Sequence, residues 1–181
     1  MIEIMGKNSS LSKRLIRRFY PTFIYNRVED IPYELIKKED IKLILLDMDN
    51  TLIDNSKKYN EKLKEWVEKM KEMGVKLYIL SNSPFGDKVK QIASELNMNY
   101  EFNATKPFLK GFKKIMQNND VKRENILMIG DQIFTDIWGG NRFGVKTILV
   151  TPINKSEALV SKVKRPLEKL VLKSYLKERD S

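Results

Sequence analysis

The stretch LILLDMDNTLID, residues 43–54, places acidic side chains directly after a run of large aliphatic residues. A short apolar run that ends in polar residues is typical of an inner strand of a parallel sheet, so we predict a buried strand over residues 42–46. Asp47 and Asp49 then lie at the C-terminal end of this strand. Two ionised carboxylates about 5 Å apart repel each other by roughly 3 kcal/mol at an effective dielectric near 20. A cation or a shared proton is therefore expected between them.

The central part of the chain alternates between helical and strand-like patterns. Apolar residues recur at helical spacing over residues 60–74, and Gly74 is suited to end that helix. We predict further buried strands over residues 75–81, 125–131 and 145–151, a weaker strand over 100–103, and helices over 87–96, 108–117 and 134–143. This alternation predicts an α/β fold in three layers, a doubly wound parallel sheet with right-handed crossovers.

In such folds ligands bind outside the C-terminal ends of the strands. Polar residues follow four of the predicted strands, namely Asp47 with Asp49, Ser81 with Asn82, Lys106, and Asp131. Each of them could simply belong to a loop or a helix cap, because these residue types are common there. Their combination along one edge of a sheet favours a functional site.

Four motifs resemble, in order and spacing, those of the haloacid dehalogenase-like (HAD) phosphatases. They are DMDNT (47–51), SN (81–82), KP (106–107) and GDQIFTD (130–136), and the resemblance covers residues 41–152. The lead-in over residues 19–52 and the segment TDIWGGNRFGVKTILVTPI (135–153) resemble the YqeG branch and the mitochondrial phosphatidylglycerophosphate phosphatases. The resemblance implies a Rossmann-like HAD core of the capless subclass IIIA, because residues 53–59 and 81–106 leave no room for a large cap.

The resemblance also implies catalytic roles. Asp47 would be the nucleophile that forms an aspartyl-phosphate, and Asp49 would act as general acid and base. Ser81 would bind the phosphoryl oxygens, and Lys106 would offset their charge together with that of the nucleophile. Thr51 is expected to be a structural clamp on the first motif.

A magnesium ion would supply the positive charge that the aspartates require. By the family pattern Mg²⁺ is bound by Asp47, Asp131 and the backbone carbonyl of Asp49, with Asp136 acting directly or through water. Four further residues are predicted to line the substrate site: Asn50, Asn82, Asn141 and Arg142. One position departs from the compared proteins, since Ser83 stands where the second motif usually has a second Asn.

The absence of histidine and cysteine excludes the usual serine and cysteine triads, His-ligated metals and any disulfide partner. The net charge of +10 is concentrated at the ends of the chain, since residues 7–27 carry six basic residues and no acidic one. A helix over residues 12–20 would have one basic and one apolar stripe, which is typical of helices at an anionic membrane surface. The tail over residues 156–177 shows a similar pattern, although its apolar stripe could equally pack on the sheet.

We therefore predict a basic amphipathic segment over residues 1–40, a phosphatase core over 41–153 and a basic helical tail over 154–181. No membrane span or secretory signal is evident, so we expect a cytoplasmic protein with basic flanks suited to the inner face of the cell membrane. The leading hypothesis is a Mg²⁺-dependent phosphatase acting on phosphatidylglycerophosphate, because an open site suits a substrate whose bulk remains outside. The alternatives are a phosphatase acting on a nucleic-acid terminal phosphate or another phosphate ester, and a HAD-fold module that binds RNA or a ribosome-associated partner.

Overall fold

The computed structural model describes residues 15–154 and 159–179, and in the second range it describes side chains from Pro166 onward. Its internal contacts divide the chain into two compact units. One unit consists of residues 21–155, and the other combines residues 1–20 with residues 156–181.

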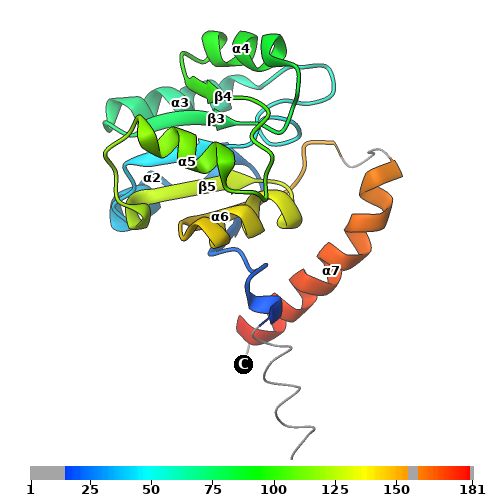
Figure 1. Cartoon of the computed structure of the whole chain (residues 1–181). Helices are drawn as coiled ribbons and strands as arrows, with labels where there is room; N and C mark the ends of the chain where they lie inside the picture. The colour runs from blue at the N-terminus through cyan, green and yellow to red at the C-terminus, as the bar shows by residue number, and fades with distance from the viewer. Residues whose placement is uncertain (1–14, 155–158, 180–181) are drawn as a thin grey trace, which may run out of the picture. The chain divides into compact units, whose positions relative to one another are not determined.

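The larger unit is built on a six-stranded parallel sheet with the strand order β1-β6-β5-β2-β3-β4 (Figure 1). The strands are β1 (Phe23–Tyr25), β2 (Leu43–Leu46), β3 (Lys76–Leu80), β4 (Asn99–Glu101), β5 (Ile126–Gly130) and β6 (Lys146–Val150). Leu46 is in register with Ile79 of β3 and with Ile129 of β5. The residues that follow these three central strands therefore emerge at one level of the sheet edge.

Helices cover both faces of this sheet (Figure 1). One apolar cluster joins the sheet to α2 (Tyr33–Lys38), α3 (Glu61–Glu72) and α4 (Gly86–Glu95), and the other joins it to α5 (Lys110–Gln117) and α6 (Trp138–Phe143). The central strand β2 shows why both faces are covered, because Ile44 and Leu46 belong to the first cluster and Leu43 and Leu45 to the second. Successive side chains of a strand point to opposite faces, so a run of aliphatic residues requires two helical layers. The predicted three-layer α/β fold without a large cap is confirmed.

Two elements of this unit were not predicted from the sequence. The strand β1 pairs in parallel with β6, and α2 packs through Ile36 into the first cluster. Residues 21–40 thus contribute to the compact unit that holds the sheet. Short 3₁₀ helices cover Val28–Asp30 and Arg123–Asn125, and a π-helical turn over Ile133–Ile137 leads into α6.

The smaller unit joins α7 (Leu159–Arg179) to the described residues that precede the sheet. Tyr20 donates a hydrogen bond of 2.8 Å to Ser174 Oγ, and its ring packs edge-on against Tyr175 at a centroid distance of 5.3 Å. Arg17 forms an ion pair of 3.0 Å with Glu178. Lys13 and Arg14 of the predicted N-terminal helix, and the side chains of the first turns of α7, lie outside the described residues. Within the described part of the chain, no helix has the length and apolar composition that a bilayer crossing would need.

Candidate active site

The first motif turns sharply at the end of β2. The backbone N–H of Asp47 still donates to Ile129 of β5 at 2.9 Å, and the N–H groups of Leu52 and Ile53 then turn back to the carbonyl of Met48 at 2.9 and 3.2 Å. Asn50 adopts a left-handed conformation with φ of 64°, which asparagine tolerates better than most residues. The turn holds the Asp47 carboxylate at the sheet edge, where it is almost fully buried.

Lys106 connects two of the predicted site carboxylates. Its Nζ lies 2.7 Å from Asp47 Oδ1 and 2.7 Å from Asp136 Oδ1, and only 1% of its side chain is exposed. The other oxygen of Asp136 accepts the backbone N–H of Gln132 at 3.1 Å. A buried ammonium of this kind is stable only with such partners, because desolvation of an unpaired charge is very costly.

Asn82 holds the backbone of Lys106 in place. Its Nδ2 donates to the carbonyl of Lys106 at 2.9 Å, and its Oδ1 accepts the N–H of Lys106 at 2.7 Å. The second and third motifs are thereby joined.

Ser81 is buried, and its Oγ accepts the N–H of Ser83 at 3.1 Å. The hydroxyl of Ser83 in turn accepts the N–H of Phe85 at 3.2 Å. Ser83, which stands where the compared proteins usually have a second Asn, thus stabilises the turn that leads into α4.

Three buried carboxylates, from Asp47, Asp131 and Asp136, offer oxygens that all lie within 4.8 Å of one another. The hydroxyl of Thr51 is 3.3 Å from Asp47 Oδ2 and 3.4 Å from Asp131 Oδ1, so it can donate to either carboxylate. With Lys106 as the one cation in contact with this set among the described residues, the formal charge of the ionised cluster is −2, from three negative charges and one positive charge. An oxygen-only donor set with excess negative charge is what a hard divalent cation prefers.

Burial and mutual repulsion change the protonation of this cluster. Burial raises the pKa of Asp131 to about 9, and the neighbouring Asp47 and Asp136 add to the increase. Burial also raises the pKa of Asp47 to about 7, against the opposing effect of the Lys106 ammonium. For Lys106 burial acts to lower the pKa, but Asp136 and Asp47 outweigh it and raise the pKa above its ordinary value. The metal-free cluster therefore retains protons at a pH at which an exposed aspartate has lost them.

Gly130 makes room for this arrangement. A Cβ atom at this position would lie 2.3 Å from both Cγ and Oδ2 of Asp136, which no real structure accommodates without a shift. The π-helical turn over Ile133–Ile137 brings Asp136 back onto the end of β5. The glycine of the fourth motif is thus needed for close approach of a buried carboxylate.

Asp49 differs from the buried cluster in its exposure and in its partner. Its side chain is 48% exposed, and its Oδ1 lies 2.5 Å from Nζ of Lys88 on α4. Lys88 was not among the residues predicted from the sequence, where it is one lysine among many on a polar helix. Its position two residues into the helix that follows the second motif is the only signal that could have indicated it.

The remaining predicted substrate residues have structural contacts of their own. The carbonyl of Asn50 accepts the N–H of Ile153 at 2.9 Å, which fastens the first motif to the segment after β6. Asn141 accepts a hydrogen bond of 3.2 Å from Thr147 of the sheet, and Arg142 donates to the carbonyl of Pro107 at 3.1 Å, next to Lys106. Substrate contacts by these residues, and by Asn82, stay a prediction.

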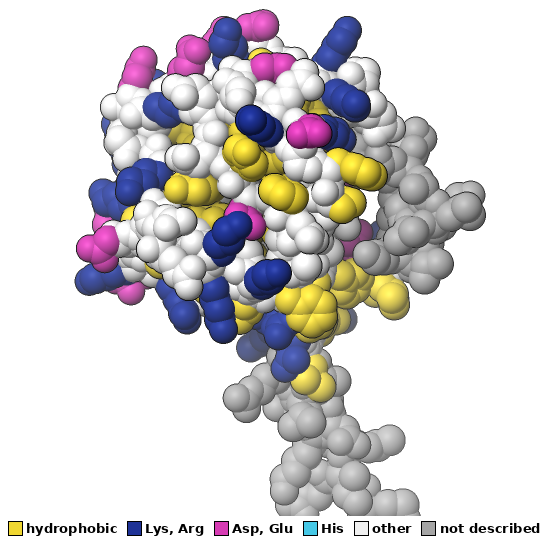
Figure 2. All heavy atoms as spheres, turned by 45° about the horizontal axis from the view of Figure 1, so that its top comes forward, with side chains coloured by type: hydrophobic (Ala, Val, Ile, Leu, Met, Phe, Trp, Pro, Cys, Tyr) yellow, Lys and Arg dark blue, Asp and Glu magenta, His cyan; other side chains and the backbone are white. Residues whose placement is uncertain are grey.

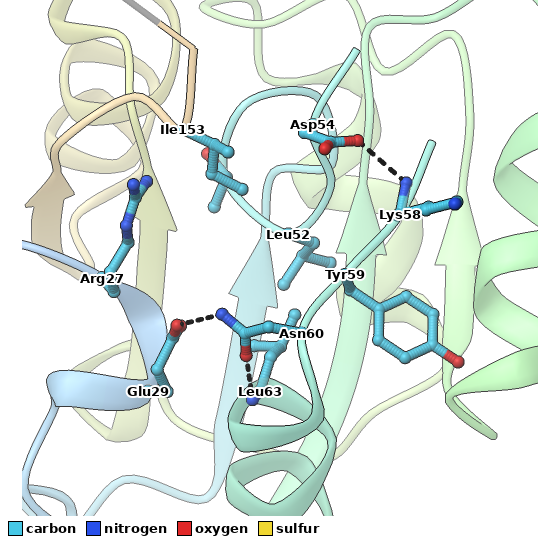
Figure 3. Close-up of a pocket in the computed structure, with 10 residues that line it drawn as sticks. Arg27, Glu29, Leu52, Asp54, Lys58, Tyr59, Asn60, Leu63 and Ile153 are labelled. Atoms are coloured by element: carbon cyan, nitrogen blue, oxygen red, sulfur yellow. Dashed lines mark hydrogen bonds between the residues drawn. The ribbon is translucent and has the colours of Figure 1, made fainter. Parts of the chain in front are cut away.

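A pocket of about 220 Å³ adjoins the first motif (Figure 3). Thr51 lines both this pocket and the carboxylate cluster. Several of its polar groups are already engaged with one another. Asn60 donates to Glu29 at 2.6 Å and caps α3, while Asp54 accepts the N–H of Lys58 at 3.0 Å. The pocket is lined by Arg27, Glu29, Thr51, Leu52, Asp54, Lys58, Tyr59, Asn60, Leu63 and Ile153.

Comparison with known proteins places this chain in a family of phosphatases. The family model described as mitochondrial PGP phosphatase matches residues 8–154. The probable phosphatase YqeG of Bacillus subtilis is 35% identical over 167 residues, which cover 91% of this chain and 96% of that protein. Phosphatidylglycerophosphate phosphatase 1, chloroplastic/mitochondrial, of Arabidopsis thaliana is 28% identical over 159 residues, which cover 82% of this chain and 45% of that protein.

A solved structure supports the fold. The putative 3-deoxy-D-manno-octulosonate 8-phosphate phosphatase of Vibrio cholerae superposes with a TM-score of 0.50 at 13% identity, covering 80% of this chain and 91% of that chain. At this identity the likeness concerns the arrangement of strands and helices. It agrees with the parallel three-layer sheet described above.

The raised carboxyl pKa values predict how metal and pH act on stability. The native state of the metal-free protein holds more protons than the unfolded state from the ordinary aspartate pKa of 3.8 up to about 9, so its free energy of unfolding should fall as pH rises through this range. A divalent cation competes with these protons. Excess MgCl₂ should therefore raise the melting temperature more at pH 8 than at pH 5.5, as measured by circular dichroism. Asp131→Asn should abolish most of the shift, and an equal shift at both pH values would contradict the assignment.

Gly130→Ala tests the close approach of Asp136. The added methyl group must displace the carboxylate, so we expect a loss of roughly 1–3 kcal/mol in the free energy of unfolding, typical of an overpacked site. Urea unfolding measures the change. Gly86→Ala is the matched control, because its methyl group would meet only the movable ring of Phe102, at 3.2 Å. Equal stability of the two variants would show that Asp136 does not require this glycine.

Proposed function

Since the chain belongs to the mitochondrial PGP phosphatase family and is a HAD-type phosphatase, we propose that it is a Mg²⁺-dependent phosphomonoesterase that converts phosphatidylglycerophosphate to phosphatidylglycerol. The observation that carries the proposed chemistry is the Lys106 ammonium bridging Asp47 and Asp136 beside Asp131. The substrate is supported by the description of the family and by the name of the Arabidopsis relative.

Asp47 is the proposed nucleophile. Lys106 fixes one of its oxygens and Thr51 lies near the other, so the carboxylate is held in one orientation. A carboxylate oxygen of Asp47 bonds to the phosphorus, and the bond from phosphorus to the lipid oxygen breaks. Water then attacks the phosphorus of the aspartyl-phosphate, inorganic phosphate leaves, and the Asp47 carboxylate is restored.

Asp49 is the proposed general acid of the first step and general base of the second. Its carboxyl group protonates the leaving lipid oxygen in the first step and takes a proton from the attacking water in the second. Its partial exposure gives it access to substrate and water, in contrast to the buried carboxylates beside it. The contact with Lys88 restrains the position of this half-exposed carboxylate.

The charge of the phosphate requires compensation by cations. The carboxylates of Asp47 and Asp131 and the backbone carbonyl of Asp49 would hold Mg²⁺, with Asp136 acting directly or through water. When bound, the ion supplies positive charge to the phosphoryl oxygens. Ser81 and Lys106 are the proposed protein donors to the same oxygens, and both are positioned by backbone and side-chain hydrogen bonds of the second motif.

The absence of a large cap supports a bulky substrate. Between the first motif and α3, and between Ser81 and Lys106, the described residues form only a short loop and the α4–β4 segment. A small soluble phosphate ester would be poorly enclosed in such a site. A phospholipid needs only its terminal phosphate to enter, while its acyl chains stay in the bilayer.

Asp47→Asn tests the nucleophile and the substrate together. Release of phosphate from phosphatidylglycerophosphate in mixed micelles should depend on Mg²⁺ and should fall by about a thousandfold or more in this variant. Circular dichroism should show an unchanged fold. Near-normal turnover by Asp47→Asn would refute the mechanism, and release from a 3′-phosphorylated oligonucleotide alone would move the function to nucleic-acid ends.

Lys88→Met tests the support of Asp49. Loss of the ion pair frees the Asp49 carboxylate, so we expect kcat to fall about tenfold to a hundredfold with little change in KM. Lys88→Arg should recover part of the rate. Both variants are assayed on water-soluble p-nitrophenyl phosphate, which requires no membrane contact. The control is Lys90→Met on the exposed side of the same helix, which should behave as wild type on this substrate. If Lys88→Met and Lys90→Met were equally active, Lys88 would have no role in the reaction.

A further inference from the structure

The two most exposed large hydrophobic side chains in the described part of the chain lie beside the active site. Phe85 is 73% exposed and Phe108 is 66% exposed. Phe85 precedes α4 on the loop that begins at Ser81, and Phe108 follows Lys106 by two residues. Each ring therefore belongs to a loop that carries a proposed phosphate-binding residue.

These loops are joined to each other by the structure of the site. Asn82 is hydrogen-bonded to both backbone groups of Lys106, and the N–H of Asn103 donates to the carbonyl of Ser83 at 3.0 Å. The ring of Phe102, a residue that is 40% exposed, lies against Gly86, next to Phe85. We call Phe85, Phe102 and Phe108 the aromatic rim. The loops that carry the rim are joined by the same hydrogen bonds that hold the backbone of Lys106.

Basic side chains accompany the rim. Lys90 on α4, Lys110 at the start of α5 and Arg142, which reaches the backbone beside Phe108, are all exposed. Figure 2 shows hydrophobic side chains surfacing among lysines and arginines on the face that carries α4. Exposed aromatic residues grouped on neighbouring loops mark an interaction surface. Rings flanked by cations are typical of proteins that contact an anionic lipid interface.

We infer that the aromatic rim docks on an anionic phospholipid bilayer, with Phe85 and Phe108 entering the interface so that a head-group phosphate meets the site. The inference rests on the proposed function. The phosphate of a lipid can reach Lys106 only at the depth of the head groups, because the acyl chains stay in the bilayer. Phe108 lies two residues from Lys106, so its entry into the interface would bring the site to that depth, and the nearby cations complement the negative surface.

The test compares two double variants of the full chain. Phe85→Ser with Phe108→Ser should bind phosphatidylglycerol vesicles about tenfold or more weakly than wild type in a flotation assay. Its kcat/KM on vesicle-borne phosphatidylglycerophosphate should fall by a similar factor, while kcat/KM on the water-soluble p-nitrophenyl phosphate should stay unchanged. The matched control is Leu170→Ser with Leu176→Ser, which removes two side chains of α7 that are 61% and 53% exposed.

The outcomes separate this inference from the proposed reaction. Vesicle binding does not need turnover, so Asp47→Asn should bind vesicles as wild type does, whether or not phosphatidylglycerophosphate is the substrate. Unchanged vesicle binding in the rim variant, or loss of binding only in the α7 variant, would overturn the inference. Dissociation of a wild-type dimer by the rim substitutions, with no effect on vesicles, would also overturn it and assign the rim to a second copy of the chain.

Discussion

The ion pairs of Lys106 are the interaction on which the site depends. Three carboxylates are gathered at one sheet edge, and without a cation among them their repulsion and desolvation would oppose folding. The ammonium reaches Asp47 and Asp136 at 2.7 Å each, and Asn82 fixes the backbone that delivers it. Because Asn82 belongs to the second motif and Lys106 to the third, a single set of contacts links three parts of the sheet edge.

One lysine does not neutralise the cluster. Burial, together with repulsion among the carboxylates, raises the pKa values of Asp47 and Asp131. When all three carboxylates are ionised, the residual formal charge of −2 makes their oxygens suitable for a divalent cation. A phosphate monoester would bring further negative charge to this site, so the proposed substrate also requires a divalent cation beside Lys106. We expect such a cluster to lower the stability of the metal-free protein, because several carboxylates are buried close together.

The hydrogen bonds at the sheet edge also connect the loops that form the surface around the site. The hydrogen bonds that fix the backbone of Lys106 also join the loops that carry the exposed rings of Phe85 and Phe108. Because the same loops carry the rings and the proposed phosphate-binding residues, binding of the rings to a bilayer would bring a lipid head group to the open site. The inferred contact at the rim is an addition to the membrane contact predicted for the basic flanks, which stays a prediction.

The sequence alone determined the sheet, its three layers and the order of the acidic residues. Short aliphatic runs that end in polar residues and alternate with helical patterns are typical of inner parallel strands, whose polar ends lie at one edge. It did not reveal β1, since three residues of an edge strand carry too little periodicity. The tertiary structure decided which side chains meet: Lys88 with Asp49, Asn82 with the backbone of Lys106, and Gly130 with Asp136. These contacts join segments far apart in the chain or depend on the path of a turn. The pattern of residues along the sequence does not predict such contacts.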